Sequence, residues 1–324
     1  MKYIILISLL VLPFIFAESE HCPVYKCNKD DSSDVCFSLK QNDTDTEITV
    51  KKCPTGKQCE EGEKAEKKCI DKANATNLLP GQACSTNDQC LSGTCTNNVC
   101  VGKAEKEACY FHETCGVGLY CANPSATEAG KCTTQKPAGQ DCSSDYECEN
   151  DSGCLFQKCT KYYSLEQGEK TTYKKFCKSN MYVTHEGVDK CADFYLVNDK
   201  EECIGTDTCT YRILLDGKVL EDETSDCQCS MVYATRTFCQ LGGNDTLYKD
   251  AIKAYTEHYE KDSKTLHTKL RNHIYDYDKL KRINLGLNSA YFKDAPDCLI
   301  QYELSIQGLK ISSMLLLVLS LFLL

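Results

Sequence analysis

Residues 81–100 read GQACSTNDQCLSGTCTNNVC, a short unit that contains four cysteines. The same spacing returns twice further along the chain, with five residues between the first and second cysteine and four or five between the second and third. Self-similarity at so short a period is typical of an array of small units. The sequence therefore predicts three four-cysteine modules over residues 80–160, built on Cys84, Cys90, Cys95, Cys100, Cys109, Cys115, Cys121, Cys132, Cys142, Cys148, Cys154 and Cys159.

Each module is too small to bury an apolar core of its own, so disulfides must hold it. Glycine, serine, asparagine and aspartate fill the intervals between cysteines and favour turns between short β-strands. Four cysteines permit three pairings, and the spacing does not choose between them. Closing a loop of about 15 residues stabilises a fold by about 3 kcal/mol in the chain-entropy model, so two bridges are comparable with the whole stability of a small domain.

The start of the chain indicates the compartment in which these cysteines mature. Residues 1–17 consist of Lys2, a long apolar run and the small residue Ala17, the pattern of a secretory signal peptide. A membrane span is the alternative, but the run is too short and Pro13 interrupts it. We expect cleavage after Ala17 and oxidation of the 26 cysteines outside the cytosol.

Four tripeptides match the acceptor pattern for N-glycosylation in a secreted chain. Their polar, mostly Asp-containing surroundings are typical of solvent-facing loops. The predicted glycan acceptors are Asn42, Asn74, Asn150 and Asn244.

Residues 311–324, ISSMLLLVLSLFLL, form an apolar tail that is shorter than the roughly 20 residues of a bilayer-spanning helix. Such a tail after a polar spacer is typical of a signal for a glycosylphosphatidylinositol anchor. We expect residues 301–324 to be this spacer and signal. Attachment at Ser305 keeps Cys298 and an even number of cysteines. The sequence thus predicts a mature protein on the extracellular face of the plasma membrane, although retention of the tail remains open.

Two further disulfide-bonded regions flank the modules. Residues 18–79 are polar and contain six cysteines, with a linker before residue 80. Residues 161–300 contain eight cysteines and several runs typical of strands, and the pair Asp216-Gly217 between two apolar runs predicts a hairpin. Cys227 and Cys229 are expected to bond to different partners, because close cysteines on a strand seldom pair with each other.

Apolar residues recur at steps of three and four over residues 246–283, which predicts a long amphipathic helix, with a break near Asp262 as an open alternative. Asp245 or Thr246 is the expected N-cap, and Gly286 the expected stop. We expect the apolar stripe to pack on the preceding sheet, with Cys298 bridging back to it. A coiled-coil stalk is the competing prediction. The fold class is therefore disulfide-rich modules followed by an α+β region with a hairpin and a long helix.

Motifs that carry chemistry are missing from the sequence. No two cysteines are separated by two residues, which argues against zinc knuckles and thioredoxin-type redox sites. The sequence also lacks HExxH, GxSxG and phosphate-loop patterns, and the histidines at 258, 267 and 273 are spaced onto different helix faces. A formal net charge of −10 gives no basis for binding nucleic acid. We predict no catalytic residue, no cofactor and no metal.

The modules GQACSTNDQCLSGTCTNNVC and AGQDCSSDYECENDSGCLFQKC resemble the Dickkopf amino-terminal cysteine-rich unit, in the form found in cysteine-rich surface proteins of ciliates. The later CQCSMVYATRTFCQLGGND, a long helix and a lone Cys298 are similar to the carboxyl-terminal part of those proteins. The second, colipase-type domain of animal Dickkopf proteins is not recognisable. The resemblance implies a disulfide frame and brings no catalytic residues.

Three functions follow as hypotheses. The first is a glycosylated, lipid-anchored surface protein that acts as a coat or as a binding or adhesion ectodomain, with an unassigned protein or glycan ligand and unassigned oligomeric state. The second is a secreted, Dickkopf-like signalling modulator or receptor ligand, which predicts lipid-free protein in the medium. The third, an extracellular enzyme in residues 162–300, requires a cleft with converging titratable groups.

Overall fold

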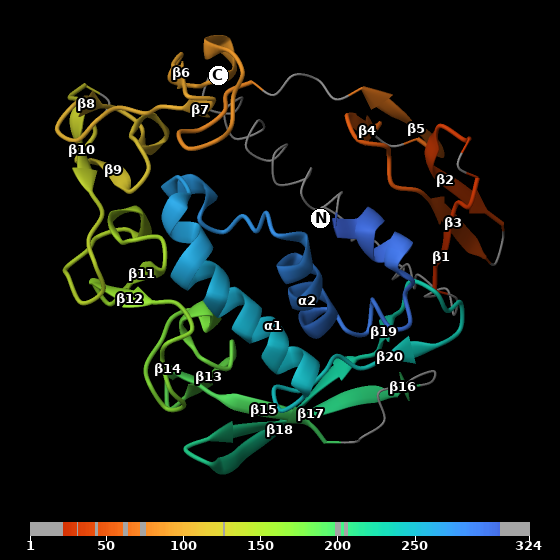
Figure 1. The fold of residues 1–324 in the computed structure, drawn as a ribbon. Helices are drawn as coiled ribbons and strands as arrows, with labels where there is room; N and C mark the ends of the chain where they lie inside the picture. The colour runs from red at the N-terminus through yellow and green to blue at the C-terminus, as the bar shows by residue number, and fades with distance from the viewer. Residues whose placement is uncertain are drawn as a thin grey trace, which may run out of the picture.

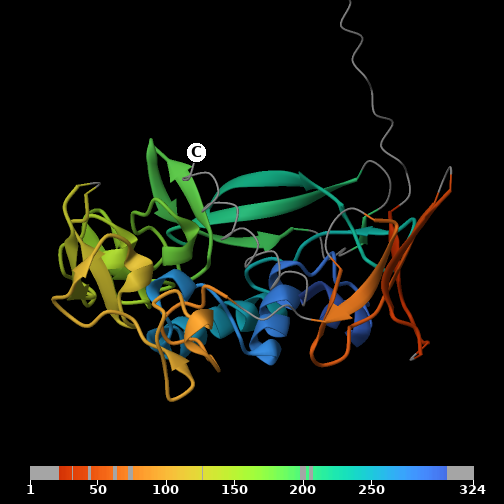
Figure 2. The same cartoon turned by 90° about the horizontal axis from the view of Figure 1, so that it is seen from above.

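A computed structural model describes residues 22–30, 32–42, 45–60, 64–71, 76–125, 127–197, 202–203 and 207–304. The predicted signal peptide, Asn74, Ser305 and the apolar tail lie outside these ranges. Figure 1 shows the cysteine modules and the N-terminal strands on opposite sides of the helices α1 and α2. The perpendicular view in Figure 2 shows the same arrangement, so the helices lie between the two ends of the molecule.

The N-terminal region is a five-stranded sheet in the order β1-β3-β2-β5-β4. Only the β1–β3 pair is parallel. Cys36 is bonded to Cys59 and Cys53 to Cys69, so these two bridges stay inside the sheet. Its strands are β1 (Val24–Cys27), β2 (Val35–Gln41), β3 (Thr46–Val50), β4 (Lys57–Cys59) and β5 (Glu66–Asp71).

The three predicted modules share one disulfide pairing, in which the first cysteine is bonded to the third and the second to the fourth. The six bridges are 84–95, 90–100, 109–121, 115–132, 142–154 and 148–159. A 3₁₀ turn precedes the second cysteine of each module: Asn87–Gln89, His112–Thr114 and Asp145–Glu147. The strands are β6 (Cys95–Thr96), β7 (Val99–Cys100), β8 (Ala108–Cys109), β9 (Leu119–Ala122), β10 (Gly130–Thr134), β11 (Ser152–Leu155) and β12 (Lys158–Lys161).

A fourth module, which the cysteine spacing does not reveal, follows the third. It has the same 3₁₀ turn, Lys174–Phe176, before Cys177, and one hairpin of β13 (Tyr182–His185) and β14 (Val188–Cys191). Cys177 is bonded to Cys191, which corresponds to the bridge between the second and fourth cysteines elsewhere. The array therefore continues past the predicted boundary at residue 160.

Backbone hydrogen bonds establish that the four modules are equivalent. In each, a residue with positive φ donates its N–H to the carbonyl of the last cysteine, over 2.7 to 2.8 Å. The four donor and acceptor pairs are Gly81 with Cys100, Lys106 with Cys132, Gly139 with Cys159, and Gly168 with Cys191. On this frame Thr171 and Tyr182 occupy the positions of the first and third cysteines, since Tyr182 lies opposite Cys191 as Cys154 lies opposite Cys159.

The double replacement Thr171→Cys and Tyr182→Cys is expected to complete the missing bridge. The equivalent pairs elsewhere have Cα atoms 5.8 to 6.1 Å apart, a distance that suits a disulfide. Closing this short loop should stabilise the module by about 2 to 3 kcal/mol. Peptide mapping without reduction should find the new crosslink, and each single variant serves as the control; two free thiols in the double variant would show that the modules are not equivalent.

The C-terminal region contains two small three-stranded sheets, and the predicted hairpin is confirmed. β17 (Thr208–Leu215) and β18 (Lys218–Asp226) are antiparallel and joined by Asp216 and Gly217, both at positive φ as a two-residue hairpin turn requires. β15 (Asp193–Leu196) completes the first sheet. The second sheet has β16 (Glu202–Cys203), β19 (Gln228–Cys229) and β20 (Thr237–Phe238).

The predicted helix over 246–283 is present but divided. α1 (Thr246–Glu257) continues through a π turn, His258–Asp262, and a 3₁₀ turn, Ser263–Thr265. After a second 3₁₀ turn, Thr268–Leu270, the chain reverses and forms α2 (Tyr277–Leu287). The alternative prediction, a helix broken near Asp262, is therefore closer to the structure. Separately, residues 297–304 form a further helical segment.

Two expectations about the helix ends have different outcomes. Asp245 is the N-cap, since its carboxylate accepts a hydrogen bond from the Leu247 N–H over 2.7 Å. Gly286, however, lies inside α2 rather than at its end. A Cβ atom at Gly286 would meet the Leu247 carbonyl oxygen at 2.4 Å and the Ala251 Cβ at 2.5 Å, so the missing side chain lets α2 lie directly on α1.

The apolar stripe of α1 packs mainly on the modules, which corrects the expected packing on the sheet. Tyr248, Ile252 and Tyr259 share a buried cluster with Leu155, Tyr162, Tyr163, Phe176 and Leu241. Phe194 of β15 contributes an edge-on contact to Tyr248 at 5.2 Å between ring centroids. Because the stripe is buried within its own chain, the coiled-coil stalk does not describe this region.

Two long-range disulfides join the N-terminal sheet to the C-terminal region. Cys22 is bonded to Cys229, and Cys27 to Cys298, over sequence separations of 207 and 271 residues. The expectation that Cys298 bridges back onto the helix and its sheet is therefore wrong. As predicted, Cys227 and Cys229 have different partners, because Cys227 is bonded to Cys203.

Candidate functional site: a connector that contacts all four modules

Residues 258–276, here called the connector, link the two helices and contact every module. In the first module the Gln82 side chain reaches the Tyr275 hydroxyl at 3.4 Å. In the second the Lys269 ammonium lies 2.8 Å from the Glu113 carboxylate. Figure 1 shows the modules curving around this segment. The connector thus joins modules that follow one another along the chain, in addition to the contacts that the later modules make with α1.

A side chain from the third module explains where the helix ends. The last carbonyls of a helix lack partners within it. The Asn150 amide donates to the carbonyl oxygens of Ser263, in the last helical turn, and of Leu266, the residue after that turn, both at 2.8 Å. The Ser263 carbonyl also accepts the Leu266 N–H at 3.0 Å. Leu266 then adopts an extended backbone, and the helix stops. The helical periodicity continues past this point, so only the tertiary contact decides the end.

The position of Asn150 also corrects a sequence prediction. Asn150 is only 2% exposed, and both hydrogen atoms of its amide nitrogen are used in the contacts with the connector. A glycan on that nitrogen would have no space in this fold. Asn150 is therefore a structural residue of the interface rather than a glycan acceptor, whereas Asn42 and Asn244 are exposed and remain predicted acceptors.

Further polar contacts surround Asn150. The Gln135 amide donates to the Cys148 carbonyl oxygen at 2.7 Å and to the Thr268 hydroxyl at 3.2 Å. The buried Arg271 guanidinium donates to the Asp145 carbonyl oxygen at 2.8 Å. Every polar contact here replaces water around a buried group, so loss of one partner leaves the other unsatisfied.

Histidines lie at three points of the same interface. His267 is fully buried; its Nε2 is 3.1 Å from the His112 carbonyl oxygen, and its Nδ1 accepts from the Lys269 N–H at 3.2 Å. His112 accepts from the Cys121 N–H through Nδ1 at 3.1 Å. His258 places Nε2 at 2.8 Å from the Arg271 carbonyl oxygen. The sequence spacing places the helix histidines on different faces and gives no sign of this cluster.

The fourth module contributes an aromatic cluster with one lysine. The Lys175 ammonium lies 3.8 Å from the ring centroid of Tyr162 and 4.3 Å from that of Tyr259, and it donates to the side-chain Oδ1 of Asn272 at 2.7 Å. Burial lowers the pKa of Lys175 to about 7. Burial also raises the pKa of the Tyr162 hydroxyl to about 12, so this ring remains a neutral partner. The contacts join the fourth module to the helix through stacked rings.

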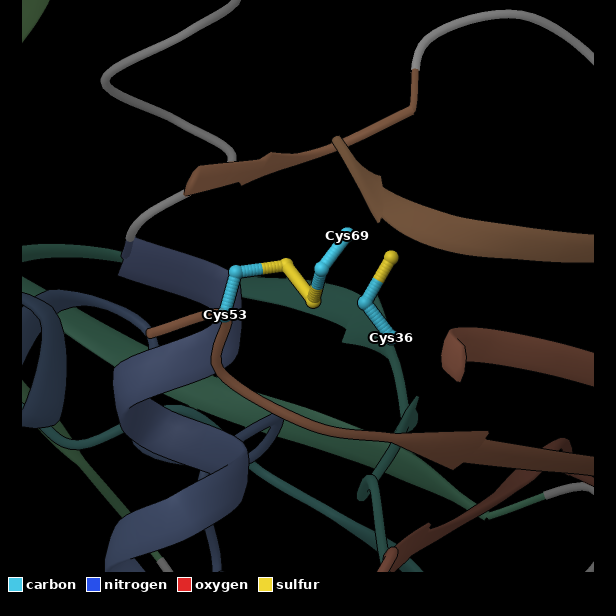
Figure 3. A group of neighbouring side chains, drawn as sticks. All are labelled: Cys36, Cys53 and Cys69. Atoms are coloured by element: carbon cyan, nitrogen blue, oxygen red, sulfur yellow. A yellow bond between two sulfur atoms is a disulfide. The ribbon is translucent and has the colours of Figure 1, made fainter. Parts of the chain in front are cut away.

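Cysteine sulfurs gather in groups of three at five places, each within 4.8 Å of one another. Figure 3 shows one group, in which Cys53 is bonded to Cys69 and Cys36 lies beside them. Cys36 is itself bonded to Cys59. All 26 cysteines lie in the described part of the chain and each is in a disulfide. Since metal ions bind the thiolate form, these sulfurs form crosslinks rather than a metal centre.

Two hollows on the described surface are open to solvent. One, of about 330 Å³, is lined by Tyr110, Phe111, Pro124 and Ser125 of the second module. The other, of about 230 Å³, lies where α2 meets β20 and is mainly apolar. The first hollow has no titratable carboxylate, histidine or lysine in its lining, and the second has Lys293 and Asp294 beside its apolar residues.

Large apolar side chains are exposed mainly on the modules. Phe111 is 68% exposed and Tyr173 is 60% exposed, and both occupy the residue just before the 3₁₀ turn of their module. Other exposed residues of this kind on the modules are Leu91, Val99, Val101, Tyr110, Val117, Phe156 and Tyr182. Exposed aromatic residues on a disulfide frame are a common means of contacting a partner.

Comparison with known families supports the modular interpretation. Residues 108–160, the second and third modules, match the family described as the Dickkopf N-terminal cysteine-rich region. The chain thus contains a Dickkopf-like cysteine-rich module, and such modules suggest an extracellular or secreted protein. Neither the curated proteins nor the solved structures contain a match to this chain. Within the described ranges, none of the helices has the length and apolar character needed to cross a bilayer.

Proposed function

We propose that this protein is a glycosylated, disulfide-rich ectodomain that acts at the cell surface as a coat or as a binding or adhesion protein, without catalysis. The observation that carries the proposal is the pairing of all 26 cysteines, which requires an oxidising compartment. The match to a Dickkopf-like region supports the same compartment. In this proposal the signal peptide is cleaved after Ala17 and the tail is exchanged for a lipid anchor at Ser305.

Anchor attachment at Ser305 would leave the buried C-terminal segment in the mature protein. Leu304, the last described residue, is buried in the core beneath the N-terminal sheet, and Cys298 is crosslinked to Cys27. Cleavage at Asp297 would remove this core segment, whereas cleavage at Ser305 would leave it whole. The alternative proposal is a secreted Dickkopf-like signalling modulator, for which the Dickkopf-like match is the specific observation.

Mass spectrometry of the native protein and treatment of intact cells with phosphatidylinositol-specific phospholipase test the anchor. We expect a mature chain that begins at Glu18, ends at Ser305 with a glycolipid, and is released by the enzyme. A mature chain that still contains Leu315 contradicts the anchor. Lipid-free protein in the medium favours the signalling alternative.

The exposed aromatic residues are the proposed contact surface. The replacement Phe111→Ser should reduce binding of the fluorescently labelled ectodomain to partner cells by about tenfold or more, because buried aromatic anchors carry much of the affinity of an interface. Val219→Ser on β18 is the matched control, since Val219 is also more than half exposed but lies outside the modules. Equal binding by both variants would place the contact elsewhere.

A further inference from the structure

We propose that the connector is an acid-sensitive latch: protonation of His112, His258 and His267 releases the second and third modules from it, while each module keeps its own fold. The three rings lie where the second module and the helices meet the connector. Below about pH 6.5 a free histidine binds a proton. The inference therefore concerns a conformational change, and it holds whether or not the protein is lipid-anchored.

The hydrogen bonds fix which ring nitrogen carries the proton. Nε2 of His267 must donate, since the His112 carbonyl can only accept, and Nδ1 must be unprotonated, since it accepts the Lys269 N–H. His112 likewise accepts the Cys121 N–H through an unprotonated Nδ1. A second proton on either ring would break a backbone hydrogen bond and leave a charge in the interface.

His258 differs from the other two histidines because its Nδ1 accepts no hydrogen bond. Its Nε2 donates to the Arg271 carbonyl, and its buried Nδ1 has no hydrogen-bond partner. The Asp262 carboxylate lies 3.7 Å from that nitrogen. However, Asp262 is already paired with Lys279, whose side chain is 9% exposed. Protonated His258 would thus share one carboxylate with a buried ammonium.

The charged groups around the other two rings give no compensating partner. Glu113 faces both His112 and His267, but its carboxylate is paired with Lys269 at 2.8 Å. Glu147 acts on His112 from a distance and is paired with Lys136. The remaining face of His112 is stacked on Tyr146 at 4.3 Å. Burial is accordingly the main cause that lowers the pKa of His112, His258 and His267.

The direction of the pH dependence follows from these states. The latched form binds fewer protons than the released form, so acid favours release. The latched form is fully stable above the pKa of the released histidines, near 6.5, and weakens as the pH falls below it. Each histidine that stays neutral in the latched form should raise the opening equilibrium about tenfold between pH 7.5 and 5.5.

Hydrogen–deuterium exchange of the full mature chain at pH 7.5 and 5.5, corrected for the intrinsic pH dependence of exchange, tests the latch. Residues 258–276 and 145–152 should lose at least tenfold in protection at pH 5.5 and regain it on return to pH 7.5. The hairpin of β17 and β18 should remain protected. Unchanged protection of the connector, or equal loss throughout the chain, would overturn the proposal.

A variant separates the latch from general acid effects. His267→Asn keeps an acceptor for the Lys269 N–H and removes the titration, so the loss of protection between pH 7.5 and 5.5 should become about tenfold smaller than in the wild type. His185→Asn on β13 is the control, because His185 is partly exposed and outside the interface. An unchanged pH response in His267→Asn would contradict the assignment, and if this variant does not fold, the wild-type comparison of connector and hairpin decides alone.

Discussion

The double replacement Cys27→Ser and Cys298→Ser is expected to lower the free energy of unfolding by about 2 to 5 kcal/mol, because it removes a bridge across a sequence separation of 271 residues. In the chain-entropy model long loops contribute most. This bridge also holds residues 297–304 against the N-terminal sheet, where Leu299, Ile300 and Leu304 are buried beside Ile48 and Val50. Replacing both cysteines avoids a free thiol.

Urea titrations followed by circular dichroism, together with limited proteolysis, measure this effect. Cleavage should begin in the N-terminal sheet while the modules stay intact. The matched control is Cys148→Ser with Cys159→Ser, which removes a bridge over 11 residues and should expose the third module instead. If both double variants are cleaved first at the same place, the N-terminal sheet does not depend on its long-range bridges.

The replacement Asn150→Ala is expected to cost about 1 to 3 kcal/mol, because the Leu266 carbonyl loses its Asn150 donor and the Ser263 carbonyl keeps only the Leu266 N–H. Asn150→Asp should be as damaging despite its equal size, since a carboxylate cannot donate to a carbonyl. Asn244→Ala, at an exposed residue of the same tripeptide pattern, should change the stability by less than about 0.5 kcal/mol in deglycosylated protein.

Thermal or urea unfolding of the three variants measures how much the Asn150 hydrogen bonds stabilise the fold. Glycopeptide mapping of the wild type shows whether Asn150 carries a glycan. We expect the peptide with Asn150 to be unmodified. Full glycan occupancy at Asn150, or a stable Asn150→Ala variant, would mean that the interface with the connector does not form as described.

The modules could be predicted from the sequence because their information is local. Cysteine spacing, turn residues and the Asp216-Gly217 pair act over a few residues, and each was sufficient to place a bridge-rich unit or a hairpin. The fourth module could not be predicted from cysteine spacing, because Thr171 and Tyr182 occupy the positions of two cysteines. What it shares with the other modules is a set of backbone hydrogen bonds. Such bonds leave no residue signature apart from Gly168 at positive φ.

The connector could not be predicted for a different reason. Helical periodicity extends through residue 283, yet the helix stops at Thr265, where Asn150, more than 100 positions earlier, binds the carbonyls of Ser263 and Leu266. The acceptor pattern at Asn150 even favoured a surface loop. Buried polar networks depend on partners distant in sequence, and composition does not encode which groups meet.

The sequence by itself determined the disulfide-rich class, the three recognisable modules, the hairpin and the N-cap at Asp245, because each depends on neighbours along the chain. Only the tertiary structure decided the choice among three pairings in each module, the bridges of Cys22 and Cys27 to the C-terminal region, and the role of residues 258–276. The physical reason is that bridge partners and buried hydrogen bonds are selected by proximity in the folded chain. Spacing alone leaves that proximity undefined.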